Sequence, residues 1–109
     1  MKRVKRRYLA VEIDSCETFN SHEFMDAVWN AVSKLFGEYG ASQTGLSLIG
    51  YDETEKLAVI RTWHKTLEMV RTALASMTQI GNKQLALHVL VVSGTIKALH
   101  RRLEEEPVQ

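Results

Sequence analysis

Residues 46–63 read LSLIGYDETEKLAVIRTW, two short apolar segments on either side of a polar turn. The first segment covers residues 46–51, and the second covers residues 56–63 and is rich in β-branched side chains. Short strands joined by a tight polar loop are typical of an antiparallel hairpin. The sequence therefore predicts two paired strands in the middle of the chain.

One further strand is predicted on each side of this hairpin. Residues 8–14, YLAVEID, alternate between the two faces of a strand, and their apolar face carries Leu9, Val11 and Ile13. Residues 85–92, LALHVLVV, are apolar on both faces. A strand of this kind implies that both faces of the sheet are covered at that point. Either a helix of the chain or a partner protein would provide the cover.

Three amphipathic helices complete the order of elements. The first is predicted over residues 21–37, with Ser21 as its N-cap, and the second over residues 65–79, ended by Gly81 and Asn82. The third is predicted over residues 95–106. The order βαββαβ plus a C-terminal helix predicts an α+β, ferredoxin-like or RRM-like sandwich with a four-stranded antiparallel sheet. A length of 109 residues predicts a single domain over residues 1–109.

The formal net charge of +1 conceals an uneven distribution of charge. Residues 1–7 form a basic arm that carries Lys2, Arg3, Lys5, Arg6 and Arg7. The rest of the chain has nine basic residues against thirteen acidic ones, a net charge of −4. Such an arm can neutralise RNA phosphates and gain free energy from the release of counterions. The alternative is an arm that only keeps the chain soluble.

The predicted third helix is the second candidate for RNA contact. It carries the cations Lys97, Arg101 and Arg102. The alternative is a solvated helix face on which these cations pair with the acidic residues 104–106. The residues just before this helix, Ser93-Gly94-Thr95, fit either an anion site at a helix N-terminus or ordinary capping.

The sequence predicts neither a catalytic residue nor a metal site in the protein itself. The four histidines lie on separate elements without the spacing of metal ligands, and Cys16 has no evident base beside it. Small acylphosphatases resemble the chain in length and topology, but Glu17 stands where their phosphate-binding loop would lie. Tyr8 and Trp63 are at strand ends, and residues 56–63 lack the aromatic pattern of an RNA-recognition module, so base stacking is not expected.

The remaining exclusions concern location. No apolar run approaches the roughly 20 residues of a membrane span, and no secretory signal is evident. A single cysteine excludes an internal disulfide bond. These observations predict a cytoplasmic protein that does not bind membranes.

Three passages resemble archaeal ribonuclease P protein component 2, the Pop-five type subunit family. They are residues 5–9 (KRRYL), residues 48–51 (LIGY) and residues 87–96 (LHVLVVSGTI). The resemblance extends over nearly the whole chain. It implies an RRM-like sandwich that does not bind RNA through the usual aromatic platform and that carries no catalytic residue. The long acidic tail of eukaryotic relatives is missing, which favours an archaeal-type protein.

The resemblance also implies partners. They are the ribonuclease P RNA, which removes the 5′ leader from precursor tRNA with bound magnesium, and a TIM-barrel-like subunit, component 3. The implied assembly is a heterotetramer around two copies of the small subunit. The protein would bind no cofactor and would contact precursor tRNA only indirectly. The apolar surface around Leu90 and Val92 is the candidate for protein contact.

A different class of function competes with this interpretation. Many ferredoxin-like domains bind small regulatory molecules and oligomerise through their sheets. Such a domain would need a ligand pocket and would not require the basic arm of residues 1–7.

Overall fold

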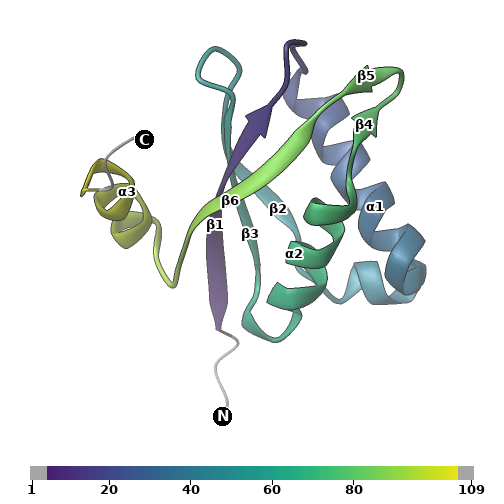
Figure 1. Cartoon of the computed structure of the whole chain (residues 1–109). Helices are drawn as coiled ribbons and strands as arrows, with labels where there is room; N and C mark the ends of the chain where they lie inside the picture. Colours follow the sequence, from purple (N-terminus) through teal and green to yellow (C-terminus); the bar gives the residue numbers. More distant parts are fainter. Residues whose placement is uncertain (1–4, 106–109) are drawn as a thin grey trace.

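The computed structural model describes residues 5–105, and Figure 1 shows how their elements are arranged. Four antiparallel strands form the main sheet in the order β2-β3-β1-β6, with bounds Ser47–Asp52, Leu57–Trp63, Arg6–Asp14 and Ala86–Ser93. Helices α1 (Ser21–Ser42) and α2 (Leu67–Ser76) cover one face, and α3 (Ile96–Glu105) lies on the other. The predicted βαββαβ sandwich with a C-terminal helix is confirmed.

The main hydrophobic core lies between the sheet and the first two helices. Leu9, Val11 and Ile13 of β1 are buried in it, as the alternation in the sequence predicts. The register pairs Leu9 with Ile60 and Val11 with Ala58. The helices supply Phe24, Val28, Val70 and Leu74. Burial of these side chains ties the central hairpin to both helices.

A second, smaller cluster lies on the opposite face of the sheet. Leu99 of α3 is fully buried against Ala10, Val59 and Val91. The third helix therefore covers the centre of this face, and on β6 it buries Val91. The register between β1 and β6 shifts at this point: Ala10 pairs with Val91 and Val11 with Val89. Leu90 is the extra residue of β6 at this bulge.

Helix α1 differs from its prediction at both ends. Its N-cap is Asn20 rather than Ser21: Asn20 Oδ1 accepts from the Glu23 N–H at 2.8 Å, and Glu23 Oε1 accepts from the Asn20 N–H at 2.9 Å. This reciprocal pair is a capping box. Helix α1 also continues past the predicted end to Ser42. The backbone at Gly37 has φ 81 and ψ 164, so the helix is kinked there and then resumes.

Helix α2 is shorter than predicted. A 3₁₀ turn, η1 (His64–Thr66), precedes it, and it ends at Ser76. The residues beyond form a small hairpin of β4 (Gln79–Ile80) and β5 (Lys83–Gln84). Gly81, with φ +63, begins the turn of this hairpin rather than ending the helix, because a tight hairpin turn requires a positive φ.

Candidate nucleic-acid interface

The predicted basic arm is in part a strand. Strand β1 begins at Arg6, so Arg6 and Arg7 belong to the sheet, and Lys5 directly precedes it. Lys2 and Arg3 lie outside the described residues. The main-chain oxygen of Lys5 accepts a hydrogen bond of 2.7 Å from the N–H of His64 at the end of β3. This end of β1 is therefore attached to the body of the protein.

The fold brings Arg7 and Arg102 to the same place from opposite ends of the chain. Arg7 Nη1 lies 3.5 Å from the position that a Cβ on Gly94 would take, so its guanidinium sits beside the β6–α3 connection. Arg102 Nη1 donates a 2.7 Å hydrogen bond to the main-chain oxygen of Val92, two residues before that glycine. Arg7 and Arg102, which the sequence suggests separately for RNA contact, thus both lie at the β6–α3 junction.

Further cations lie at the start of β1, and the sequence did not predict them as RNA contacts. Arg6 pairs with Trp63 and Tyr8 with Arg61 across β1 and β3. Because β3 runs antiparallel to β1, its last residues, followed by His64 and Lys65, lie beside the start of β1. The antiparallel pairing of the first and third strands, which the predicted βαββαβ order implies, was the signal that could have placed them there. We call this surface the basic end, made of Lys5, Arg6, Arg7, Arg61, His64, Lys65 and Arg102.

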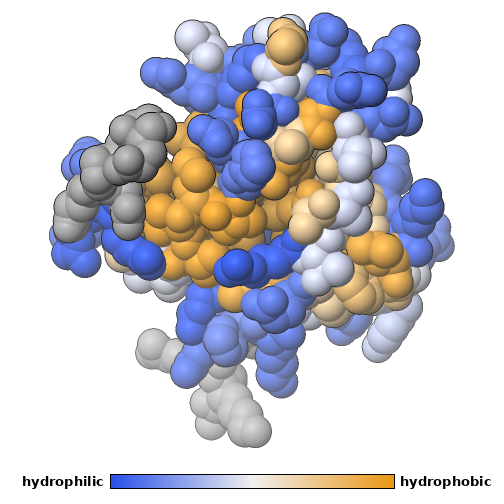
Figure 2. Space-filling model, in the orientation of Figure 1, coloured by the Kyte–Doolittle hydropathy of each residue, from blue (hydrophilic) through white to orange (hydrophobic). Residues whose placement is uncertain are grey.

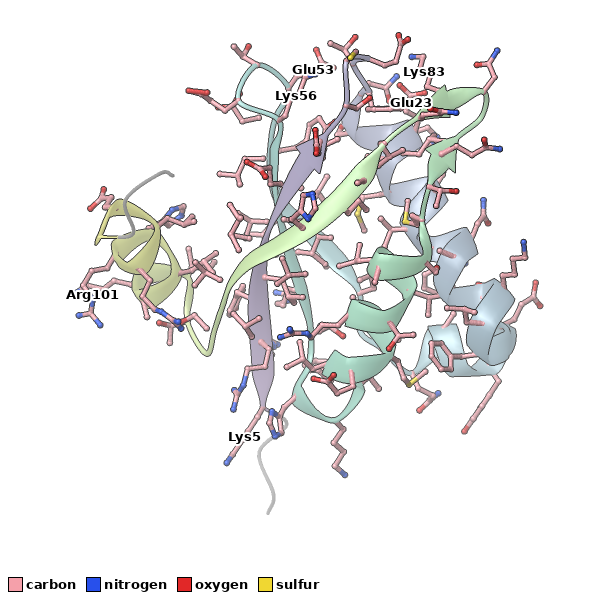
Figure 3. All side chains as sticks on the ribbon, viewed as in Figure 1. Lys5, Glu23, Glu53, Lys56, Lys83 and Arg101 are labelled. Carbon is pink, nitrogen blue, oxygen red and sulfur yellow. The ribbon has the colours of Figure 1, made fainter. Side chains whose placement is uncertain are left out.

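The remaining predicted contacts on α3 are spread along that helix. Lys97 and Arg101 are exposed. In Figure 3 Arg101 points away from the sheet, whereas Lys5 stands where β1 begins. The structure therefore joins Arg102 to the basic end and places Arg101 on the outer side of α3.

The opposite end of the molecule carries carboxylates. Glu23 and Glu53 lie at the end farthest from Lys5 in Figure 3, together with Lys56 and Lys83, and Lys83 Nζ is 4.0 Å from Glu23 Oε1. Asp14, the last residue of β1, is 3.6 Å from His88 Nε2. Strand β1 thus runs from arginines at its start to a carboxylate at its end, so the charge of this strand is polarised along its length.

The residues before α3 act as a cap. Thr95 Oγ1 accepts a 3.1 Å hydrogen bond from the Ala98 N–H, and Ser93 Oγ accepts from the Thr95 N–H at 3.4 Å. These contacts satisfy donors at the helix N-terminus in the usual way. Of the two interpretations of this passage, capping is the one that the structure confirms.

The two residues predicted for protein contact face different environments. Leu90 is 48% exposed, whereas Val92 is partly buried and packs against the helix-side core. Figure 2 shows hydrophobic surface between β6 and α3. Leu90 of β6 and Ile96, the first residue of α3, are both exposed. The accessible apolar surface on this strand is therefore centred on Leu90.

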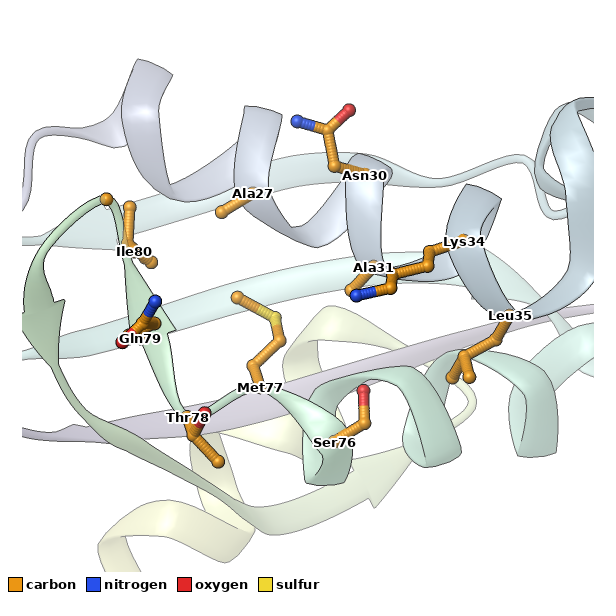
Figure 4. Close-up of a pocket in the computed structure, with 11 residues that line it drawn as sticks. Ala27, Asn30, Ala31, Lys34, Leu35, Ser76, Met77, Thr78, Gln79 and Ile80 are labelled. Atoms are coloured by element: carbon orange, nitrogen blue, oxygen red, sulfur yellow. The ribbon is translucent and has the colours of Figure 1, made fainter.

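A groove of about 500 Å³ lies between α1 and the segment that joins α2 to β5. Figure 4 shows Met77 pointing into it and Asn30 pointing away. Lys34 supplies an ammonium group at its rim. A specific ligand site needs several polar groups that converge, and the groove favours no particular ligand.

The described residues form neither a cluster of metal ligands nor a membrane-spanning helix. Within residues 5–105, no three or more His, Cys, Asp or Glu side chains gather closely enough to hold a metal ion. The helices of this same range also include none with the length and apolarity needed to cross a membrane.

Residues 7–104 match the model of the Rpp14/Pop5 family. The chain belongs to this family. Ribonuclease P protein component 2 of Pyrococcus furiosus is 36% identical over 100 residues, which cover 92% of this chain and 83% of the relative. The protein of the same name from Methanosarcina mazei is 34% identical over 107 residues, or 97% and 90% of the two chains.

A chain of known structure has the same fold as this Rpp14/Pop5 protein. A chain in the cryo-EM structure of yeast ribonuclease MRP superposes with a TM-score of 0.72 at 16% sequence identity. The superposition covers 96% of this chain and 93% of the yeast one. The sandwich with its C-terminal helix is thus shared across a large difference in sequence.

Proposed function

We propose that this Rpp14/Pop5 chain is a protein subunit of ribonuclease P, in which it supports RNA-borne removal of the 5′ leader from precursor tRNA. The observation that carries the proposal is the position of both Arg7 and Arg102 at the β6–α3 junction. Family membership and the names of the relatives support it.

The basic end would bind the ribonuclease P RNA through its phosphates. Arginine and lysine contacts to phosphates position a protein on RNA, and they gain from counterion release. The carboxylates at the far end of β1 would repel the same backbone. This polarity therefore directs the RNA toward Lys5, Arg7 and Arg102. Further contacts come from Lys2, Arg3, Lys97 and Arg101.

The exposed apolar surface at Leu90 would face a protein partner. Strand β6 is at the edge of the main sheet, and an exposed apolar edge strand favours association. We assign this surface to the TIM-barrel-like component 3, in a heterotetramer with two copies of this chain in the cytoplasm. The magnesium of the reaction would be held by the RNA, as the resemblance to ribonuclease P component 2 implies.

Reconstitution tests this function. The full chain, its component 3 partner and a ribonuclease P RNA are combined, and leader removal from precursor tRNA is measured at low magnesium. We expect the chain to increase cleavage. We also expect the variant with Lys5→Gln and Arg7→Gln to bind the RNA more weakly, and the slope of log affinity against log salt to fall by about one for each lost phosphate contact.

The matched control removes two positive charges elsewhere. Lys34→Gln with Arg71→Gln alters exposed residues of α1 and α2, away from the basic end. It should leave the salt dependence nearly unchanged. No gain in cleavage with the natural chain, or equal salt slopes for the two double variants, would contradict the proposal.

A further inference from the structure

Helix α3 covers only the centre of one sheet face. The end of this face that carries Trp63 and Arg6 is exposed. Leu99 covers Ala10 and Val59, which occupy the middle of β1 and β3. The aromatic platform of an RNA-recognition module would lie in the middle of these strands. Trp63 and Arg6 are outside the cluster under α3. The end of the face therefore stays open where its middle is closed.

Trp63 is held at this open end by a glycine. A Cβ on Gly45 would come within 2.4 Å of Trp63 Cε2 and Nε1, so any other residue there would collide with the indole. Gly45 also has φ +61, which favours glycine. The main-chain N–H of Trp63 donates a 2.9 Å hydrogen bond to Thr44 O. The indole ring is therefore fixed in place while remaining partly exposed.

Two arginines lie on the same face of the sheet as this ring. The guanidinium carbon of Arg6 lies over the indole, 5.4 Å from its centroid, and the Arg6 side chain is exposed. Arg61 lies on the same face of the sheet, since it pairs with Tyr8 as Trp63 pairs with Arg6. Its Nε is buried without a hydrogen-bond partner among the described residues.

No carboxylate competes for these cations on the strands here. The described strand residues of this end of the face are Arg6, Tyr8, Ser47, Arg61, Trp63 and Ser93, and none is acidic. The carboxylates of the same face of β1, Glu12 and Asp14, lie at its other end. An aromatic ring with one arginine over it and a second on the same sheet face matches an unpaired nucleotide, which has a flat base and flanking phosphates.

We infer that Trp63 stacks with one unpaired base of RNA, while Arg6 and Arg61 contact the neighbouring phosphates. The base takes the place of the Arg6 guanidinium over the indole, because stacking on an aromatic ring is stronger than an exposed cation–π contact. Arg6 then turns to a phosphate. This site deepens the proposed function and rests on it, and it adds a contact that distinguishes single-stranded from paired RNA.

Tryptophan fluorescence provides a direct test. The chain has two tryptophans, so Trp29→Phe leaves Trp63 as the only indole. This variant of the full chain is titrated with a single-stranded ten-residue oligoadenylate and with a duplex RNA carrying the same number of phosphates. We expect the single strand to quench the emission of Trp63 and the duplex to leave it nearly unchanged. Equal responses to the two RNAs would overturn the inference.

Substitution of the ring tests its energetic role. Trp63→Leu should weaken binding of the single strand about five- to hundredfold and leave duplex binding within about twofold. Trp63→Phe should restore most of the loss. Trp29→Leu is the matched control, since Trp29 is 40% exposed on α1. An unchanged affinity of Trp63→Leu for the single strand would also overturn the inference, provided that its circular dichroism spectrum is native.

Failure of this inference and failure of the proposed function give different results. If stacking is absent but the function holds, Trp63 is not quenched while the Lys5→Gln, Arg7→Gln variant still lowers the salt slope. If the function itself is wrong, that double variant and its control show equal slopes.

Discussion

Tyr51 shows how one side chain links the hairpin to the loop before α1. Its hydroxyl donates a 2.5 Å hydrogen bond to the main-chain oxygen of Phe19, and its ring lies 5.5 Å from that of Phe24. Burial, and then the carboxylates of Glu53 and Glu23, raise the pKa of Tyr51 above its ordinary value of 10.0. The folded protein therefore favours the neutral phenol.

This raised pKa predicts a loss of stability in alkali. Above pH 10 the phenol ionises in the unfolded chain before it does so in the folded one, so the free energy of unfolding falls as the pH rises. Tyr51→Phe should lower the free energy of unfolding by about 0.5–1.5 kcal/mol at pH 7, because the hydrogen bond is lost. It should also make the decline above pH 10 shallower. Urea unfolding at pH 7 to 11 measures both effects.

Tyr39 offers the control for that series. It is 79% exposed on α1, and Tyr39→Phe should change neither the free energy of unfolding at pH 7 nor its decline in alkali by much. Parallel pH profiles for the natural chain and Tyr51→Phe would contradict the argument.

Helix α3 depends on its contact with the sheet. It has ten residues, and isolated helices of this length are marginal in water. Leu99 is its one fully buried side chain among those described, and Leu103 is partly buried beside it. The attachment of α3 therefore rests largely on Leu99.

Leu99→Ala should destabilise the protein by about 2–5 kcal/mol, or release α3 from the sheet. Hydrogen exchange separates the two outcomes, since release would expose the amides of α3 while those at the centre of β1 stay protected. Ile96→Ala removes an apolar side chain that is already 37% exposed, so it should lower the free energy of unfolding much less than Leu99→Ala does. Equal effects of the two substitutions would show that Leu99 has no special role.

The whole molecule presents two distinct surfaces, one basic and one apolar. The basic end lies where β1 begins, and the apolar surface around Leu90 lies along β6 toward α3. A subunit of a particle can therefore contact RNA at one place and protein at another.

Leu90→Asp should weaken association with component 3 at least tenfold, because a charge would be placed against an apolar partner surface. The mass of the mixture, measured by light scattering with and without component 3, reports the association. Asn30→Asp adds the same charge on an exposed part of α1 and should leave the mass unchanged. An unaltered complex with Leu90→Asp would remove this surface from the interface.

The order of the main elements and the buried face of β1 followed from the sequence. Alternation in residues 8–14 placed Leu9, Val11 and Ile13 in the core, because a strand turns successive side chains to opposite faces. Helix ends were less predictable. Asn20 caps α1 through a contact with Glu23, and Gly81 turns a hairpin after α2 has already ended. Local patterns of turn residues do not say which element they belong to.

The sequence predicted only part of the candidate site. The basic residues 2–7 and the cations of α3 stand out in the chain, since a run of like charges is a local feature. The tertiary structure alone decided that Arg7 lies beside Gly94 and that Arg102 binds the main chain at Val92. It alone also decided that Arg6 lies over Trp63 and that Gly45 holds the indole. Each of these contacts joins residues far apart in the chain. Their meeting depends on strand register and on where α3 docks, which periodicity along the sequence does not encode.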